Sequence, residues 1–340
     1  MGNARTLGAF LAILSGLMNG SFTLPMRFLG RWHWENVWSV FIVVSCLVLP
    51  AGVLGFSHAH LFAVIALAPA HSVIIAIFTG LAWGFGAIMF GQSVSAIGIS
   101  LANTLVLAIS SAFGALLPLA LLAPQKISLP SGHKILTGVA VEIIGIALCG
   151  YAGRLREAAP QHRGDFVGRA RPFSIGLLLA TGAGLLSGVF NIGFALAQPV
   201  AAAARHAGLS RITSTNIVWW LMLGSGSIAN LAFCAYLFRK NRSFATFRQV
   251  RAPRYYLLSI LMALLWGGSI FVYGAAASKM GVLGAEIGWP LSLATGLLLA
   301  NAIGIALGEW KGTPAKARAW MYAGLAILVL AIIQLSRANG

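Results

Sequence analysis

Ten apolar runs of membrane-spanning length divide this chain and limit the folds open to it. An α-helix needs about 20 apolar residues to cross roughly 30 Å of hydrocarbon. The chain is 59% hydrophobic and only 9% charged, with a mean hydropathy of +0.88, whereas soluble domains are about a quarter charged. We therefore predict an all-α polytopic membrane protein with ten transmembrane helices. The runs cover residues 6–25, 36–56, 70–96, 99–123, 133–152, 173–197, 213–238, 255–278, 282–308 and 318–336.

The basic residues predict how these helices are oriented. The formal net charge is +17, but Lys and Arg occupy short loops between apolar runs, so no nucleic-acid partner is expected. Counted over alternate loops, 16 basic residues fall on one side of the membrane and 7 on the other. Because cytoplasmic loops carry the excess of Lys and Arg, the side with 16 basic residues is predicted to be cytoplasmic and both termini are predicted to lie outside. The first run lacks a convincing cleavage site, so no cleavable signal peptide is expected.

Two segments of the chain repeat each other at an offset of 183 residues. The first copy contains, in order, Trp83, Gly84, Gly91, Gly98 and Asn103. The second copy contains, in the same register, Trp266, Gly267, Gly274, Gly281 and Glu286. Internal repeats that place polar groups at matched membrane depths are typical of transporters.

The repeat extends to the first helix of each half. Four positions recur at an offset of 168 residues: Gly8, Gly16, Gly20 and Phe22 return as Gly176, Gly184, Gly188 and Phe190. Five helices per half is an odd number, so the halves must sit in the membrane with opposite orientation. This is the inverted-repeat architecture, with a substrate site near the midplane. The predicted units are the first repeat, 1–157, a basic cytoplasmic linker, 158–172, and the second repeat, 173–340.

Several segments are similar to a known family. They are residues 31–39 (Arg-Trp-His-Trp-Glu-Asn-Val-Trp-Ser), Leu49-Pro50, Trp83-Gly84 through Phe90-Gly91 to residues 98–101, Gly145 to Gly153-Arg154, and Arg156-Glu157. With these segments the chain resembles the L-rhamnose–proton symporter family of the drug/metabolite transporter superfamily, most closely over residues 15–157.

The resemblance implies a ten-helix 5+5 fold in which helices 1–4 and 6–9 line a central cavity. Helices 5 and 10 are then peripheral supports and the expected surface of a homodimer. The resemblance also implies inward transport of a six-carbon deoxy sugar with a proton as coupling ion, and no other cofactor. Members of the family differ in the sugar they carry, so L-rhamnose and related sugars both stay open.

Glu286 is the first candidate for proton coupling. Only six acidic residues are present, and a carboxyl group within a membrane span is functional by default. A medium of low dielectric favours its neutral form, and a group charged in one conformation and neutral in another suits proton coupling. The alternative is a snorkelling residue near the helix start. Gly288 and Pro290 follow, so we expect a kink or local unwinding there, as a hinge or as a packed bend.

Glu142 is the rival candidate, and it corresponds to no feature of the family pattern. Because its helix is expected to be peripheral, a helix partner or a dimer contact is the alternative to a place on the substrate path. The other four acidic residues are expected in hydrophilic connections: Glu35, Glu157, Asp165 and Glu309.

Amides and indoles within the apolar runs are the candidates for sugar binding. An amide can donate and accept hydrogen bonds, as sugar hydroxyls require, although it can equally join two helices. Tryptophan faces stack on the apolar face of a pyranose, although tryptophan is also the usual interfacial anchor. The candidates are Asn19, Gln92, Asn103 and Asn191 among the amides, and Trp83, Trp266 and Trp289 among the indoles.

The sequence gives no indication of an enzyme. It has no Walker A, HExxH, CxxC or GxSxG motif, and its three cysteines lack metal-ligand spacing. We predict a proton-coupled sugar importer that works by alternating access. A carrier or exporter of a different small metabolite on the same fold is the alternative. A membrane enzyme acting on a lipid-linked sugar is a remote one, because the acidic residues are too scattered for a catalytic cluster.

Overall fold

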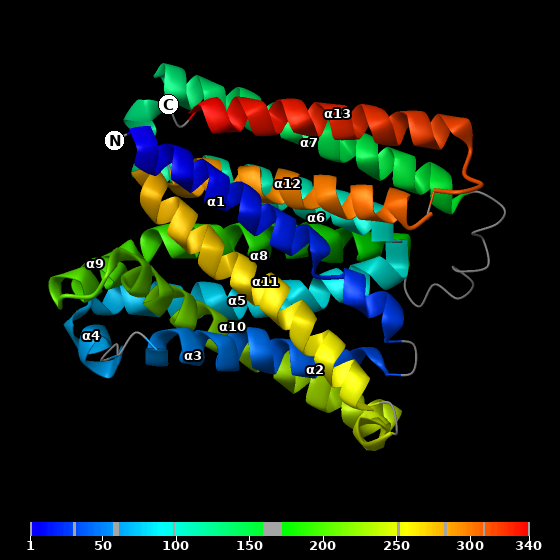
Figure 1. The fold of residues 1–340 in the computed structure, drawn as a ribbon, viewed down its shortest axis with the longest axis horizontal. Helices are drawn as coiled ribbons and strands as arrows, with labels where there is room; N and C mark the ends of the chain where they lie inside the picture. The colour runs from blue at the N-terminus through cyan, green and yellow to red at the C-terminus, as the bar shows by residue number, and fades with distance from the viewer. Residues whose placement is uncertain are drawn as a thin grey trace.

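The computed structural model describes residues 2–29, 32–56, 61–97, 99–158, 172–249, 252–281, 284–308 and 310–338. The regular elements in these ranges are all helices (Figure 1), which confirms the predicted all-α class. The long helices form a bundle, and the two termini lie at the same end of it.

The boundaries of the long helices agree with the apolar runs to within a few residues. In chain order the elements are α1 (Gly2–Ser21), the 3-10 helix η1 (Leu24–Phe28), α2 (Trp34–Ile42), the π-helical η2 (Val43–Val48), α3 (Leu49–Phe56), α4 (Leu61–Leu67), α5 (Ala70–Ile97), α6 (Ile99–Leu122), the 3-10 helix η3 (Pro124–Lys126), α7 (Pro130–Glu157), α8 (Phe173–Leu196), α9 (Gln198–His206), α10 (Arg211–Asn241), the 3-10 helix η5 (Ser243–Arg248), α11 (Ala252–Met280), α12 (Gly284–Ala306) and α13 (Ala315–Ala338). The sequence did not predict α4, α9 and the 3-10 helices, because pieces this short carry no spanning signal.

Within the described ranges, nine segments are long and apolar enough to cross a membrane. They are Trp34–Gly55, Ala70–Ser93, Ala102–Leu122, Pro130–Arg156, Phe173–His206, Arg211–Asn241, Ala252–Met280, Gly284–Ala306 and Ala315–Arg337. The tenth predicted span is helix α1, which is not among them because Arg5, Asn19 and several small residues make it less apolar. The protein is thus a polytopic membrane protein with nine candidate spans in the described ranges.

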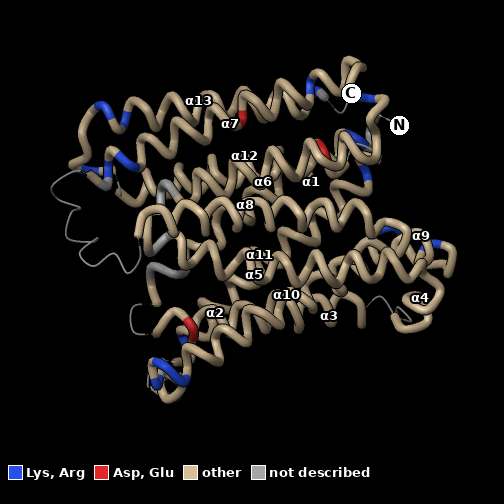
Figure 2. Tube along the Cα trace, turned by 180° about the vertical axis from the view of Figure 1, so that it is seen from behind, with Lys and Arg blue, Asp and Glu red and all other residues tan. Residues whose placement is uncertain are grey.

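Lys and Arg residues gather at the two ends of the bundle (Figure 2). This agrees with their predicted position in the loops between spans. The predicted basic linker is described only at Ala158 and Pro172, and residues 159–171 lie outside the described part of the chain, as do Arg31 and Glu309.

The first helix of each predicted half packs on the other half. Helix α1 lies against α11 and α12, and helix α8 lies against α5 and α6. Helices α7 and α13 pack mainly on each other and on α6 and α12. The elements around the centre of the bundle therefore come from both halves of the sequence.

Glycines bring these crossing helices close together. A Cβ atom added at Gly20 in α1 would lie 3.0 Å from the carbonyl carbon and 3.1 Å from the Cα of Gly296 in α12. A Cβ atom at Gly188 in α8 would lie 3.0 Å from Cδ1 of Phe113 and 3.2 Å from the backbone nitrogen of Gly114 in α6. Small residues allow this approach of helix backbones within a membrane.

Candidate functional site

A cavity of about 130 Å³ lies among six helices of both predicted halves: α1, α5, α6, α8, α11 and α12. No Asp, Glu, Lys, Arg or His is among its described lining residues, so this lining is uncharged at neutral pH. The lining consists of Ser15, Asn19, Trp83, Val106, Leu107, Ser110, Ser187, Phe190, Trp266, Ser269, Ile270, Tyr273, Trp289, Ser292 and Leu293.

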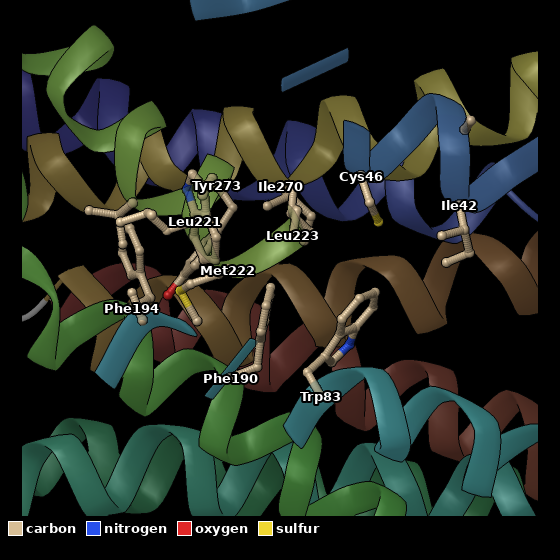
Figure 3. Packing of buried hydrophobic residues seen from close by; sticks show 14 of the residues in the cluster. Ile42, Cys46, Trp83, Phe190, Phe194, Leu221, Met222, Leu223, Ile270 and Tyr273 are labelled. Atoms are coloured by element: carbon tan, nitrogen blue, oxygen red, sulfur yellow. The ribbon is translucent and has the colours of Figure 1, made fainter. Parts of the chain in front are cut away.

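Two repeat-related tryptophans form the aromatic part of the lining. The rings of Trp83 and Trp266 stack with centroids 5.2 Å apart and 15° between their planes. Phe190 lies beside Trp83 at 5.1 Å, and Phe41 packs against Trp266 at 5.5 Å. Figure 3 shows Trp83 and Phe190 side by side, directed toward side chains of facing helices such as Tyr273. Both repeat-related tryptophans therefore line the cavity, and their role in binding a sugar stays a prediction.

Hydroxyl groups form the polar part of the lining. Ser15 Oγ donates to the carbonyl of Ser269 at 2.9 Å and lies 3.0 Å from Ser292 Oγ. Ser110 Oγ is buried and has no hydrogen-bond partner in the described part of the chain. Since buried polar groups are normally hydrogen-bonded, a ligand hydroxyl would satisfy Ser110. The amide of Asn19 adds a group that can donate and accept.

The side chain of Asn191 joins four helices next to the cavity. Pro118 has no backbone N–H, so the carbonyl of Gly114, four residues earlier in α6, lacks its helical donor. Asn191 Nδ2 donates to this carbonyl at 2.7 Å and to the carbonyl of Ala285 in α12 at 3.3 Å. The hydroxyl of Tyr273 in α11 donates to Asn191 Oδ1. Asn191 is fully buried and is not a lining residue, so it joins helices in this structure.

Glu286 lies in the first turn of α12, beside this junction. Its side chain is 1% exposed, and its Oε2 atom has no hydrogen-bond partner among the described residues. It does not line the cavity, but Trp289 one turn later does. Tyr273 in α11 and Lys126 in η3 are titratable groups near this carboxyl group. Burying a carboxylate with an unsatisfied oxygen is costly, and binding a proton removes that cost.

Glu142 is a second buried carboxyl group, within α7. It is fully buried, Ser111 Oγ donates to its Oε2 atom at 2.6 Å, and its Oε1 atom has no partner in the described ranges. Ser111 follows the lining residue Ser110 in α6. Glu142 is therefore separated from the cavity by one helix.

The other predicted residues lie away from the cavity or in regular helix. Gln92 and Asn103 are half-buried and are not lining residues. Helix α12 continues through Gly288 and Pro290, so the expected unwinding is not present in this structure. Their role as a hinge stays a prediction.

The expectation that Glu35 lies in a hydrophilic connection is wrong. Glu35 is 2% exposed in the first turn of α2 and accepts hydrogen bonds from Asn241 Nδ2 at 2.9 Å and from Ser243 Oγ. Asn36 Nδ2 donates to the carbonyl of Ser243 at 3.1 Å. The error arose because the apolar run was taken to begin at residue 36. These bonds tie the start of α2 to the end of α10.

The expected set of lining helices is also too large. The resemblance implied helices 1–4 and 6–9, but the described residues of predicted helix 2 (α2, η2 and α3) and predicted helix 7 (α10) are not among the lining residues. They pack behind it: Asn230 Nδ2 in α10 donates to the carbonyl of Gly84 in α5 at 3.2 Å. A Cβ atom added at Gly267 in α11 would lie 3.1 Å from Cβ of Ser45 in η2.

Sequence reasoning missed Tyr273 and the five lining serines. A serine in a membrane helix can bond to the carbonyl one turn earlier, so serine in an apolar run indicates no particular role. Ser187 is the exception, because it occupies the repeat position of Asn19 at an offset of 168 residues. That correspondence was sufficient to predict it.

The spans and the uncharged cavity between them define the class of protein, a multi-pass membrane transporter. The chain belongs to the RhaT family of L-rhamnose–proton symport proteins, whose model matches residues 1–338. Proteins named L-rhamnose-proton symporter from Yersinia pestis (strain Pestoides F) and Yersinia pseudotuberculosis (serotype O:3, strain YPIII) are each 28% identical over 346 residues, covering 97% of this chain and 97% of theirs. One from Salmonella typhi is 25% identical over 340 residues, with the same coverage. This confirms the resemblance seen in the sequence, and the family is one of transporters, not enzymes.

Proposed function

We propose that the protein imports L-rhamnose, or a closely related neutral sugar, together with a proton. The observation that carries this proposal is the cavity, in which the Trp83–Trp266 pair, Asn19 and several serine hydroxyls occur together without a charged lining residue among those described. Aromatic faces suit the apolar face and methyl group of a deoxy sugar, and hydroxyls and amides suit its polar edge. The naming of the relatives as proton symporters supports the coupling ion.

The proposed mechanism is alternating access by two inverted halves, residues 1–157 and 173–340. The packing of the helices supports this arrangement, because α1 on α11 and α12 corresponds to α8 on α5 and α6 when the halves are exchanged. Helices α1 and α8 also run in opposite directions through the bundle in Figure 1. Carriers with such repeats bind their substrate near the midplane, between the halves.

Glu286 is the proposed proton carrier, and Glu142 is its rival. Helix α12 begins at the end of the bundle that holds the termini (Figure 1), and the excess of basic residues in the opposite loops supports a periplasmic position for this end. Glu286 would load a proton there, favour sugar binding, and release it after the cavity opens inward. The bacterial inner membrane is the proposed location, and the peripheral helices α7 and α13 are the proposed surface of a homodimer.

Proton movement in proteoliposomes tests this function. On addition of L-rhamnose, wild-type protein is expected to alkalinise the outside. Glu286→Gln is expected to lose this signal while sugar exchange continues, and Glu142→Gln, the same change at the other buried carboxyl group, is expected to keep it. Unchanged proton uptake by Glu286→Gln would exclude Glu286 as the carrier. Movement with another solute but not with L-rhamnose would refute the substrate and keep the fold.

A further inference from the structure

Tyr273 lines the cavity, and its hydroxyl is bonded to Asn191, the residue that joins four helices next to the cavity. The side chain is 1% exposed, its ring lies among the lining residues, and it packs edge-on to Trp289 with centroids 5.4 Å apart. The hydroxyl donates to Asn191 Oδ1, and Asn191 is not a lining residue. A ligand that presses on this ring therefore acts on a hydroxyl whose hydrogen bond is made outside the cavity.

The junction continues directly to the start of α12. Asn191 Nδ2 is shared between the carbonyl of Gly114 in α6 and that of Ala285, the residue immediately before Glu286. Gly114 belongs to the first predicted half, whereas Asn191 and Ala285 belong to the second. The bond from Asn191 to Gly114 thus crosses between the halves, and it replaces the helical donor that Pro118 does not supply.

The Tyr273 ring and the first turns of α12 are in close contact. A Cβ atom added at Gly288 would lie 3.2 Å from Cε2 of Tyr273, so little space separates the ring from the helix. Among the described residues, the titratable groups near Glu286 on neighbouring elements include Tyr273 in α11 and Lys126 in η3. A displacement of Tyr273 therefore changes the surroundings of the first turns of α12, where the carboxyl group lies.

We propose that Tyr273 and Asn191 are positioning residues that couple sugar in the cavity to the proton on Glu286. The inference rests on the proposed function. Sugar that contacts the Tyr273 ring shifts the hydroxyl of that tyrosine. The hydrogen bonds from Asn191 Nδ2 to the carbonyls of Gly114 and Ala285 then change in relative strength, and the first turn of α12 moves with Ala285. Removing the hydroxyl is therefore expected to lower the number of protons moved per sugar.

Tyr273→Phe removes the hydroxyl and keeps the ring. In proteoliposomes, radiolabelled L-rhamnose and a pH-sensitive dye give protons moved per sugar, and tryptophan fluorescence gives sugar affinity. We expect continued sugar exchange and at least about a fivefold lower proton-to-sugar ratio, whatever the change in sugar affinity. Tyr322→Phe in α13, where the side chain is 55% exposed, is the matched control and is expected to keep the ratio.

An unchanged ratio in Tyr273→Phe would overturn the proposal. Weaker sugar binding with an unchanged ratio would also overturn it, because Tyr273 would then be a plain sugar ligand. If Tyr273→Phe does not fold, Gly288→Ala provides the test, because its new methyl group displaces the Tyr273 ring and removes no polar group. Gly288→Ala is expected to lower the proton-to-sugar ratio. An unchanged ratio in this variant would contradict the proposal. A wild-type protein that moves sugar without protons would refute the proposed function itself, and the inference with it.

Discussion

Replacing Gly20 by alanine tests the close contact between the two predicted halves. The new Cβ atom would lie 3.0 Å and 3.1 Å from two backbone atoms of Gly296, and still closer to its carbonyl oxygen. Because all three are backbone atoms, no side chain can rotate away, and helices α1 and α12 must separate. Overpacking costs about 1–3 kcal/mol, while the higher helix propensity of alanine returns about 1 kcal/mol. We expect a net loss of up to roughly 2 kcal/mol in the free energy of unfolding.

Two matched glycines supply the comparison. At Gly188, the repeat partner of Gly20, the new Cβ atom would lie 3.0 Å from Cδ1 and 3.1 Å from Cβ of Phe113 and 3.2 Å from the backbone nitrogen of Gly114, so it meets no backbone atom as close as the Gly296 carbonyl oxygen. A loss of less than about 1 kcal/mol is expected there. At Gly52 in α3 no atom lies within 4 Å of the new Cβ, so the change is expected to be neutral or to stabilise by up to about 1 kcal/mol.

The assay is denaturant unfolding of the purified protein in detergent, followed by tryptophan fluorescence. The expected order of stability is Gly20→Ala below Gly188→Ala below Gly52→Ala. Equal stability of Gly20→Ala and Gly52→Ala would refute the close contact of α1 with α12. If Gly20→Ala has wild-type stability but reduced sugar exchange, the close contact of α1 with α12 limits the movement of these helices during transport and not the stability of the fold.

Two further predictions concern the aromatic and polar contacts. Trp266→Ala removes one ring of the stacked pair and is expected to weaken sugar binding at least about tenfold in a fluorescence titration. Trp266→Phe is expected to keep most of the affinity, and Trp320→Ala in α13 is the control. If Trp266→Ala binds sugar as tightly as Trp320→Ala, the stacked pair is not part of the sugar site. Asn241→Ala deprives buried Glu35 of a hydrogen bond and is expected to destabilise the fold by about 1–3 kcal/mol, measured by denaturant unfolding. Gln249→Ala, at an exposed position, should change stability by less than about 0.5 kcal/mol. If Gln249→Ala lost as much stability as Asn241→Ala, the loss in Asn241→Ala would not come from the hydrogen bond to buried Glu35.

The spans were predictable from the sequence because hydropathy is a local property. The run expected at 70–96 is α5, Ala70–Ile97, and the run expected at 282–308 is α12, Gly284–Ala306. In the same way, a large indole or an amide is unusual in an apolar run, so Trp83, Trp266 and Asn19 could be identified as candidates, and all three line the cavity.

Contacts between distant segments could not be predicted in this way. The partner of Glu35 is about 200 residues away in the chain, and no local pattern indicates that pairing. The role of Asn191 depends on Pro118 in another helix, which leaves a carbonyl without its donor. The serines that line the cavity are of the same type as those that bond within their own helix, so only their three-dimensional placement separates the two groups.

The packing of α1 has a consequence for the biosynthesis of the protein. Ser15 in α1 makes its hydrogen bond to Ser269 across 254 positions of the chain, and the helices that α1 contacts most, α11 and α12, are nearly the last to be made. At about 5–20 residues per second, a ribosome needs roughly 13–50 seconds to reach them after completing α1. During that interval the glycine-lined face and the serine hydroxyl of α1 face lipid or the insertion machinery. Helix α1 therefore enters the membrane well before its permanent neighbours exist.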